Sequence, residues 1–185
     1  IGNLVSQCFY DGKLQNGKQN SDIPDIYSTL PSRMKSTVTW LDTIKLPNAY
    51  HKDDKGSLMN QAEADLIIKL LQDLSANREF NDSETIRSCI SKGEAAIGVI
   101  CMYGEQKRLI RKKFNEKDWS DTFKQLVKID TVDSYQGKEN HIIILSITRN
   151  DKQHSTGFLK LPNRINVALS RAMDKLIIVG ATSMW

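Results

Sequence analysis

The sequence contains little cysteine and no long apolar run. Its three cysteines, Cys8, Cys89 and Cys101, lie far apart, and no two have the spacing of a metal site or a redox pair. We therefore expect reduced thiols, no metal site, and an intracellular protein that is cytoplasmic or nuclear. No stretch is long and apolar enough for a transmembrane helix, and the N-terminus lacks a signal-peptide pattern, so we expect no membrane partner.

Neither sign of charge dominates the composition. The chain has 26 basic and 22 acidic residues, a net charge of +4, and 39% hydrophobic residues. This balance is ordinary for a globular domain and is compatible with an anionic partner without identifying one. A length of 185 residues fits one domain with its own core. Because the chain begins with Ile1 and not Met, we expect residues 1–185 to be one domain of a longer protein, with a loop-rich segment at 11–36.

Apolar periodicity predicts helices that alternate with strands. Helices are expected at 1–9, 62–74, 104–116 and 162–172, with a further short one after Ser83. Strands are expected at 37–43, 96–101, 126–132, 141–147 and 175–181, and a polar loop from 44 to about 60. The strands are apolar on both faces, which is typical of a mainly parallel sheet covered by helices on each side. The predicted fold class is therefore α/β.

The stretch TVDSYQGKEN (131–140) contains a Gly-Lys pair but lacks the other residues of a phosphate loop. That pattern needs a second glycine where this chain has Val132, and a serine or threonine where it has Glu139. The stretch follows a predicted strand, and CMYGEQ (101–106) follows another. Ligands of parallel sheets bind at the carboxyl ends of the strands. We therefore expect both stretches to contribute polar groups to a site at that edge.

Three stretches together resemble a known family. IGVICMYGEQ, DTVDSYQGKENHIIILSITRN and GFLKLPNRINVALSRAMDKLIIVG resemble motifs IV, V and VI of superfamily 1 helicases, in the branch of the nonsense-mediated-decay helicase. The head of the chain, IGNLVSQCFYDGKLQNG, resembles the segment that opens the second RecA-like lobe in that branch. The resemblance implies a C-terminal RecA-like lobe, a three-layer sandwich with a mainly parallel sheet of about five or six strands.

The resemblance also implies a nucleotide site shared between two lobes. The cofactors would be ATP and Mg²⁺, with the phosphate loop and the Mg²⁺-binding acidic residues on the first lobe, which this chain does not contain. By motif position, Arg171 would be an arginine finger on the γ-phosphate. Gln136, Gly137 and Glu139 would approach the nucleotide, and Arg164 is a candidate for a further phosphate contact. An isolated second lobe would be inactive.

Single-stranded DNA or RNA is the second partner that the resemblance implies, besides the first lobe. Thr131 and Ser134 would contact the nucleic-acid backbone, and Tyr103 would lie near the strand-binding surface. Cys101-Met102 stand where the family has Thr-Pro, so this turn lacks the family's threonine hydroxyl and rigid proline.

Residues 104–117 hold six basic side chains against two acidic ones, and this excess has two interpretations. The basic residues are Lys107, Arg108, Arg111, Lys112, Lys113 and Lys117. They fit a nucleic-acid footprint, in which Lys107, Arg108 and Arg111 contact phosphates. They also fit the solvated face of an amphipathic helix.

Structural alternatives accompany the other site residues as well. Arg171 could cap its helix, where a cation near the C-terminal end is favourable. Arg164 could form a structural ion pair, and Arg149 is expected to pin the loop after its strand. Glu139 could be a solvated loop carboxylate. For the protein as a whole, the alternatives to a helicase are a non-catalytic nucleic-acid-binding or regulatory module, and an ATPase switch coupled to a fused effector.

Overall fold

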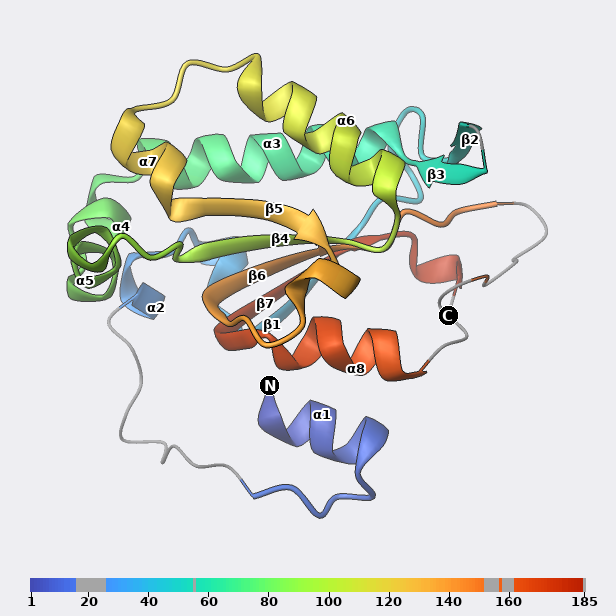
Figure 1. Ribbon diagram of the computed structural model, residues 1–185, viewed down its shortest axis with the longest axis horizontal. Coiled ribbons are helices and arrows are strands. Elements are labelled where there is room, and N and C mark those ends of the chain that lie inside the picture. Colours follow the sequence, from blue (N-terminus) through green and yellow to red (C-terminus); the bar gives the residue numbers. More distant parts are fainter. Residues whose placement is uncertain (16–25, 55, 152–156, 158–161, 185) are drawn as a thin grey trace.

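The computed structural model describes the chain except for residues 16–25, 55, 152–156, 158–161 and 185 (Figure 1). The helices are α1 Gly2–Phe9, α2 Ile26–Thr29, α3 Gln61–Ala76, α4 Arg78–Asp82, α5 Glu84–Lys92, α6 Gly104–Asn115, α7 Asp121–Leu126 and α8 Pro162–Ser170. Single-turn 3-10 helices are η1 Ser32–Met34, η2 Asp133–Tyr135 and η4 Thr182–Met184. The strands are β1 Val38–Asp42, β2 Lys52–Asp54, β3 Ser57–Met59, β4 Ile97–Cys101, β5 Val127–Thr131, β6 Asn140–Ser146 and β7 Ala172–Gly180.

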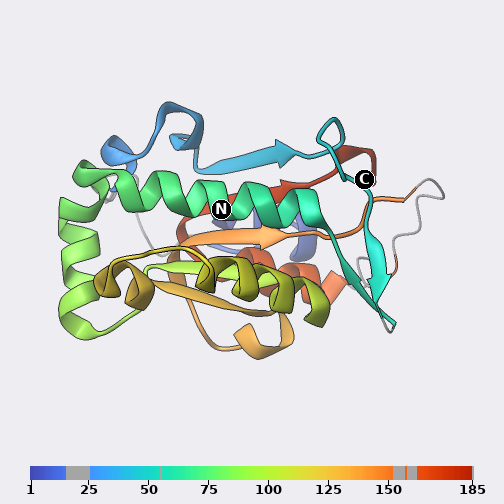
Figure 2. The same cartoon turned by 90° about the horizontal axis from the view of Figure 1, so that it is seen from above.

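The main sheet has five strands in the order β1-β7-β6-β4-β5, and every neighbouring pair is parallel. Helices α3, α6 and α7 cover one face, while α1 and α8 lie on the other (Figures 1 and 2). Successive residues of β6 point to opposite faces, so Ile142 and Ile144 join the core under α3, and Ile143 and Leu145 join the core under α8. The predicted α/β sandwich with a parallel sheet is confirmed.

Several local predictions were wrong. The expected loop before Asn60 contains the β2–β3 hairpin, whose turn is closed by a hydrogen bond from Gly56 N to Asp53 Oδ1 at 2.8 Å. Three short helices, α2, α4 and α7, were missed, although α4 and α7 each begin at a polar cap. Asn77 accepts from the main chain of α4, and Ser120 accepts from that of α7. Helix α8 ends at Ser170, before the predicted end at 172.

The aromatic and cysteine side chains differ in how deeply they are buried. Trp119 is buried and stacks between Phe114 and Phe123, with ring centroids 4.9 and 5.3 Å away. The three cysteines are free thiols, of which Cys89 and Cys101 are buried and Cys8 is exposed. Within the part of the segment 11–36 that the structure describes, α2 and η1 pack apolar side chains into the core. In the described ranges, no helix combines the length and the apolar composition needed to span a membrane.

Gly98 determines how the chain passes from β5 to β6. Because β4 lies between these two strands, residues 132–139 must cross it on the α8 side. The buried Tyr135 ring lies over Gly98, and its hydroxyl bonds to Asn140 Oδ1 at 2.9 Å. A Cβ at position 98 would stand 2.4 Å from the Tyr135 hydroxyl oxygen. Only glycine leaves room for this crossing, which places η2 beside α8.

Candidate functional site

Helices η2 and α8 enclose a small groove of about 220 Å³, which we call the α8 groove. Its lining residues are Val132, Asp133, Gln136, Asn163, Arg164 and Val167. The Arg164 guanidinium pairs with Asp133 across the groove at 3.0 Å, so the ion pair proposed as an alternative for Arg164 is present. The structure therefore brings Gln136 and Arg164, from different motifs, to one site.

Arg171 lies two turns beyond Arg164, just after the last residue of α8. Arg171 does not line the α8 groove, although its side chain folds back onto the last turn of α8. The Arg171 Nε donates to the Val167 carbonyl at 3.1 Å, and its Nη2 donates to Ser170 Oγ at 2.9 Å. The helix-capping contact considered as an alternative is thus present. Both partners are uncharged, and no carboxylate among the described residues pairs with Arg171.

Glu139 lies at the other edge of the sheet from the one predicted. The stretch 131–140 starts at the carboxyl end of β5 and crosses to the amino end of β6, because the two strands run in the same direction in the parallel sheet. Gly137, with φ of +76°, turns the chain before Glu139. Asn140 N donates to the Arg171 carbonyl at 3.1 Å. The prediction of a single carboxyl-edge site was therefore wrong for Glu139, which instead comes next to the chain segment of Arg171.

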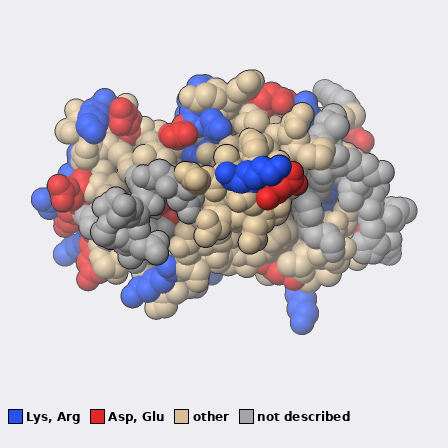
Figure 3. Space-filling view, turned by 90° about the horizontal axis from the view of Figure 1, so that it is seen from below, with Lys and Arg blue, Asp and Glu red and all other residues tan. Residues whose placement is uncertain are grey.

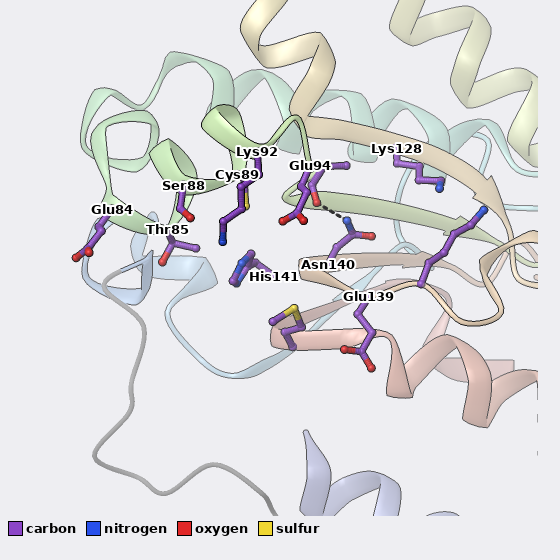
Figure 4. Close-up of a pocket in the computed structure, with 13 residues that line it drawn as sticks. Glu84, Thr85, Ser88, Cys89, Lys92, Glu94, Lys128, Glu139, Asn140 and His141 are labelled. Atoms are coloured by element: carbon purple, nitrogen blue, oxygen red, sulfur yellow. Dashed lines mark hydrogen bonds between the residues drawn. The ribbon is translucent and has the colours of Figure 1, made fainter.

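A second, larger pocket of about 930 Å³ is lined by residues of α5 on one side and by Glu139 and Asn140 on the other (Figure 4). The lining includes both basic side chains, such as Lys92 and Lys128, and acidic ones, such as Glu84 and Glu94. His141 lies at the same pocket, with its Nδ1 2.5 Å from Asp174 Oδ2. Among the described residues, no cluster of histidine, cysteine and carboxylate side chains could hold a metal ion. The pocket has mixed charge and shows no preference for one class of ligand.

The carboxyl ends of β4 and β5 carry the residues predicted to contact nucleic acid. Thr131 Oγ1 donates to Ser134 Oγ at 3.2 Å, and both side chains reach the surface. Tyr103 is only 5% exposed, and its hydroxyl accepts from Arg149 Nε at 2.7 Å. Arg149 also pairs with Asp151 at 3.7 Å and so pins the loop after β6, as predicted. Because the Tyr103 side chain is buried, its ring has little surface on which a base could stack.

The basic side chains of α6 are mostly neutralised within the chain. Lys107 pairs with Asp130 at 3.5 Å, and Arg111 pairs with the same carboxylate at 3.9 Å while it donates to the Ile129 carbonyl. Arg108 pairs with Asp54 at 3.1 Å. The remaining pairs are Lys112 with Glu116 at 3.9 Å and Lys113 with Asp65 at 2.6 Å. Only Lys117 of the six has no such pair among the described residues, so these contacts favour the interpretation of α6 as a solvated face.

The face formed by α1 and α8 has the opposite character. Its central surface is largely uncharged, with a few basic and acidic side chains on it (Figure 3). An apolar pocket of about 530 Å³ opens between the two helices and the sheet, lined by residues that include Leu4, Phe9, Trp40 and Ile165. Trp40 is 37% exposed, and its ring nitrogen donates to the Gly180 carbonyl at 2.9 Å. This face is apolar enough to pack against another protein surface.

A buried polar network at the carboxyl end of β6 was missed by the sequence reasoning. We call it the edge network, and its members are Asn60, Glu63, Gln106, Ser146, Thr148 and Asn150, none more than 3% exposed. Burial raises the pKa of Glu63 to about 8, although hydrogen bonds from Ser146 and the backbone act in the opposite direction. The signal in the sequence was a carboxylate at position 63, on the same helical stripe as Ile67, Leu70 and Leu74.

The parallel sheet, the α8 groove and the crossing under α8 together define a RecA-like α/β domain of the nucleotide-hydrolase type. The chain belongs to the AAA domain family, whose pattern matches residues 1–183. The resemblance to superfamily 1 helicases is thereby confirmed.

Similar proteins include several helicases. The chain is 31% identical over 183 residues to mouse "5'-3' DNA helicase ZGRF1", a match that covers 99% of this chain and 8% of the relative. It is 27% identical to "DNA replication ATP-dependent helicase/nuclease DNA2" of Saccharomyces cerevisiae, over 99% of this chain and 12% of the relative. It is 28% identical to "Helicase sen1" of Schizosaccharomyces pombe, over 97% of this chain and 10% of the relative. The chain thus spans a small part of the length of these relatives.

Proposed function

We propose that this chain is the second RecA-like lobe of an ATP-dependent superfamily 1 helicase. In this proposal ATP and Mg²⁺ are held by a first lobe, because the phosphate-loop pattern of the present chain fails at Val132 and Glu139. The α8 groove faces the nucleotide, and the carboxyl ends of β4 and β5 face single-stranded DNA or RNA. The apolar face of α1 and α8 supports packing against that first lobe. The buried free thiols Cys89 and Cys101 are consistent with an intracellular location.

The observation that carries this proposal is that Arg171 pairs with no carboxylate in the part of the chain that the structure describes. Its guanidinium is partly exposed and bonds only to a carbonyl and a hydroxyl among the described residues. Phosphoryl transfer concentrates negative charge on the γ-phosphate, and a finger arginine contributes on the order of 10³–10⁵ in rate. Arginine suits this role because its planar fork stays charged and can bond two phosphate oxygens. Arg171 can exchange its weak capping bonds for that ligand.

The test is the Arg171→Ala change in a full-length protein that contains this chain. We expect strand-stimulated kcat to fall at least about a hundredfold, because the interaction strengthens as the phosphoryl group departs. Arg171→Lys should rescue little, since it keeps the charge and loses the fork. Melting temperature and nucleotide-free strand affinity should be retained. Arg87→Ala, which removes an exposed arginine of α5 paired with Asp82, is the matched control.

Near-normal turnover in Arg171→Ala would refute the finger assignment. A large fall in melting temperature together with lost activity would support helix capping as the main role of Arg171. The isolated chain, supplied with ATP, Mg²⁺ and single strands, should release no phosphate above a buffer blank. Turnover that survives repurification of the isolated chain would contradict the assignment of the phosphate-binding machinery to another lobe.

A further inference from the structure

Thr148 has an unusual backbone conformation for a threonine. Its φ is +72°, in the left-handed region that β-branched residues rarely adopt. The residue is fully buried, and its hydroxyl has no hydrogen-bond partner in the part of the chain that the structure describes. Thr148 is the second residue after β6, which is the central strand of the five-stranded sheet. A strained residue at such a position persists only when its surroundings hold it there.

Glu63 and Asn60 are the groups that hold Thr148. The Thr148 main-chain nitrogen donates to both carboxylate oxygens of Glu63, at 2.9 and 2.8 Å. Its carbonyl accepts from Asn60 Nδ2 at 3.1 Å. Ser146 Oγ lies 2.6 Å from the same carboxylate, to which it donates. Both main-chain polar groups of Thr148 are thus fixed by side chains from the first turn of α3 and its cap.

The restrained turn continues directly into the edge predicted to face nucleic acid. Arg149, the next residue, donates to the Tyr103 hydroxyl at 2.7 Å. Gln106, in the first turn of α6, donates to Ser146 Oγ at 3.0 Å and accepts from Asn60 N at 2.7 Å. The edge network therefore joins the end of β6 to the starts of α3 and α6.

We propose that Glu63 is a positioning residue for the nucleic-acid edge. It holds Thr148 in the left-handed conformation, and through Arg149 it fixes Tyr103 and the first turn of α6. This inference rests on the proposed function. The carboxyl group is what fixes Thr148, because its oxygens accept from the Thr148 N–H, and an apolar side chain in its place would leave that N–H without this acceptor. Aspartate is one methylene shorter and would not reach.

The test measures strand-stimulated ATP hydrolysis in a full-length protein that contains this chain. We expect Glu63→Met, which keeps the length of the side chain and removes both oxygens, to raise the strand concentration for half-maximal stimulation about tenfold, with kcat at saturating strand within about twofold. Adding Thr148→Gly should restore most of the loss, since glycine adopts a positive φ without a side-chain penalty. Asp65→Asn is the matched control, because it lies on the same helix but pairs with Lys113 at the surface.

Tyr103→Phe tests the same connection from its other end and leaves the buried carboxyl in place. It removes only the hydroxyl that accepts from Arg149, and it should raise the half-maximal strand concentration in the same direction. The proposal is overturned if neither change affects that concentration. It is also overturned if kcat and strand affinity fall together with melting temperature and Thr148→Gly restores neither.

A crystal structure of Glu63→Met separates this proposal from the proposed function. We expect the distance between Arg149 Nε and the Tyr103 hydroxyl to exceed 3.5 Å, compared with 2.7 Å in the unchanged chain. If the unchanged protein shows no strand-stimulated turnover, the proposed function fails and this distance alone decides the positioning role. An unchanged contact in Glu63→Met would then refute it.

Discussion

Helices α6 and α8 both carry arginine, but they use it differently. On α6, cations such as Lys107 and Arg108 pair with carboxylates of the same chain. On the α8 side, Arg164 pairs with Asp133, while Arg171 bonds only to uncharged groups among the described residues. A count of basic residues suggests α6 as the site for an anionic ligand, whereas the ion-pair contacts suggest the end of α8, where Arg171 lies. The difference teaches that an unneutralised cation, more than a basic run, marks where an anionic ligand is expected.

The largest expected effect comes from a change at Gly98, which displaces Tyr135 and so disturbs the crossing that places η2 beside α8 at the α8 groove. Gly98→Val would place side-chain atoms where the Tyr135 hydroxyl and the Ile143 side chain lie, 2.4 and 2.6 Å from a Cβ. We expect a loss of at least about 3 kcal/mol of unfolding free energy, seen as a fall of roughly 6–12 °C in melting temperature. Gly104→Ala, where the nearest atom lies 4.0 Å from a Cβ, is the control. Equal melting temperatures for the two variants would contradict the account of the crossing.

A smaller effect concerns the buried carboxyl beside α6. The pKa of Glu63 is about 8 in the folded chain, above its ordinary value of 4.5. Between these values the unfolded chain releases the proton that the folded chain keeps, so stability falls as pH rises. Burial also raises the pKa of the neighbouring Cys101 thiol, which stays neutral throughout this range.

The pH dependence is measured against a variant that cannot titrate. From about pH 5 to 8, the unfolding free energy of the unchanged chain should fall relative to that of Glu63→Gln, by up to about 1 kcal/mol per pH unit. Denaturant unfolding at several pH values measures this difference. Parallel pH profiles for the two proteins would mean that Glu63 is ionised in the folded state throughout.

The smallest expected effect is on α6 itself. Replacing Lys107, Arg108, Arg111 and Lys112 by alanine removes cations that are already paired, so strand affinity should change less than about threefold. The log–log salt slope should change by less than about 0.7, the value of one phosphate contact on a single strand. Titration of a labelled strand at several salt concentrations measures both. A slope reduction of about 2 would instead support direct contacts by three of these residues.

The sequence indicated most of the sheet because its strands are continuous apolar runs such as 141–147. It missed the β2–β3 hairpin, since both strands are only three residues long and β2 consists entirely of charged residues. The position of Glu139 was predictable but was missed: residue 139 lies just before the predicted strand 141–147, and in a parallel sheet the residue before a strand lies at its amino end. Glu63 was overlooked because a charged residue on an apolar helix is read as solvated unless its partners are known.

Nucleotide binding to a full-length protein that contains this chain tests the central claim most directly. ADP with aluminium fluoride mimics the phosphoryl group in transfer, whereas ADP alone lacks the group that Arg171 is proposed to contact. We expect Arg171→Ala to weaken binding of the aluminium fluoride complex at least about a hundredfold and to change ADP affinity less than about threefold. Equal affinities of the unchanged protein and Arg171→Ala for the aluminium fluoride complex would contradict the account.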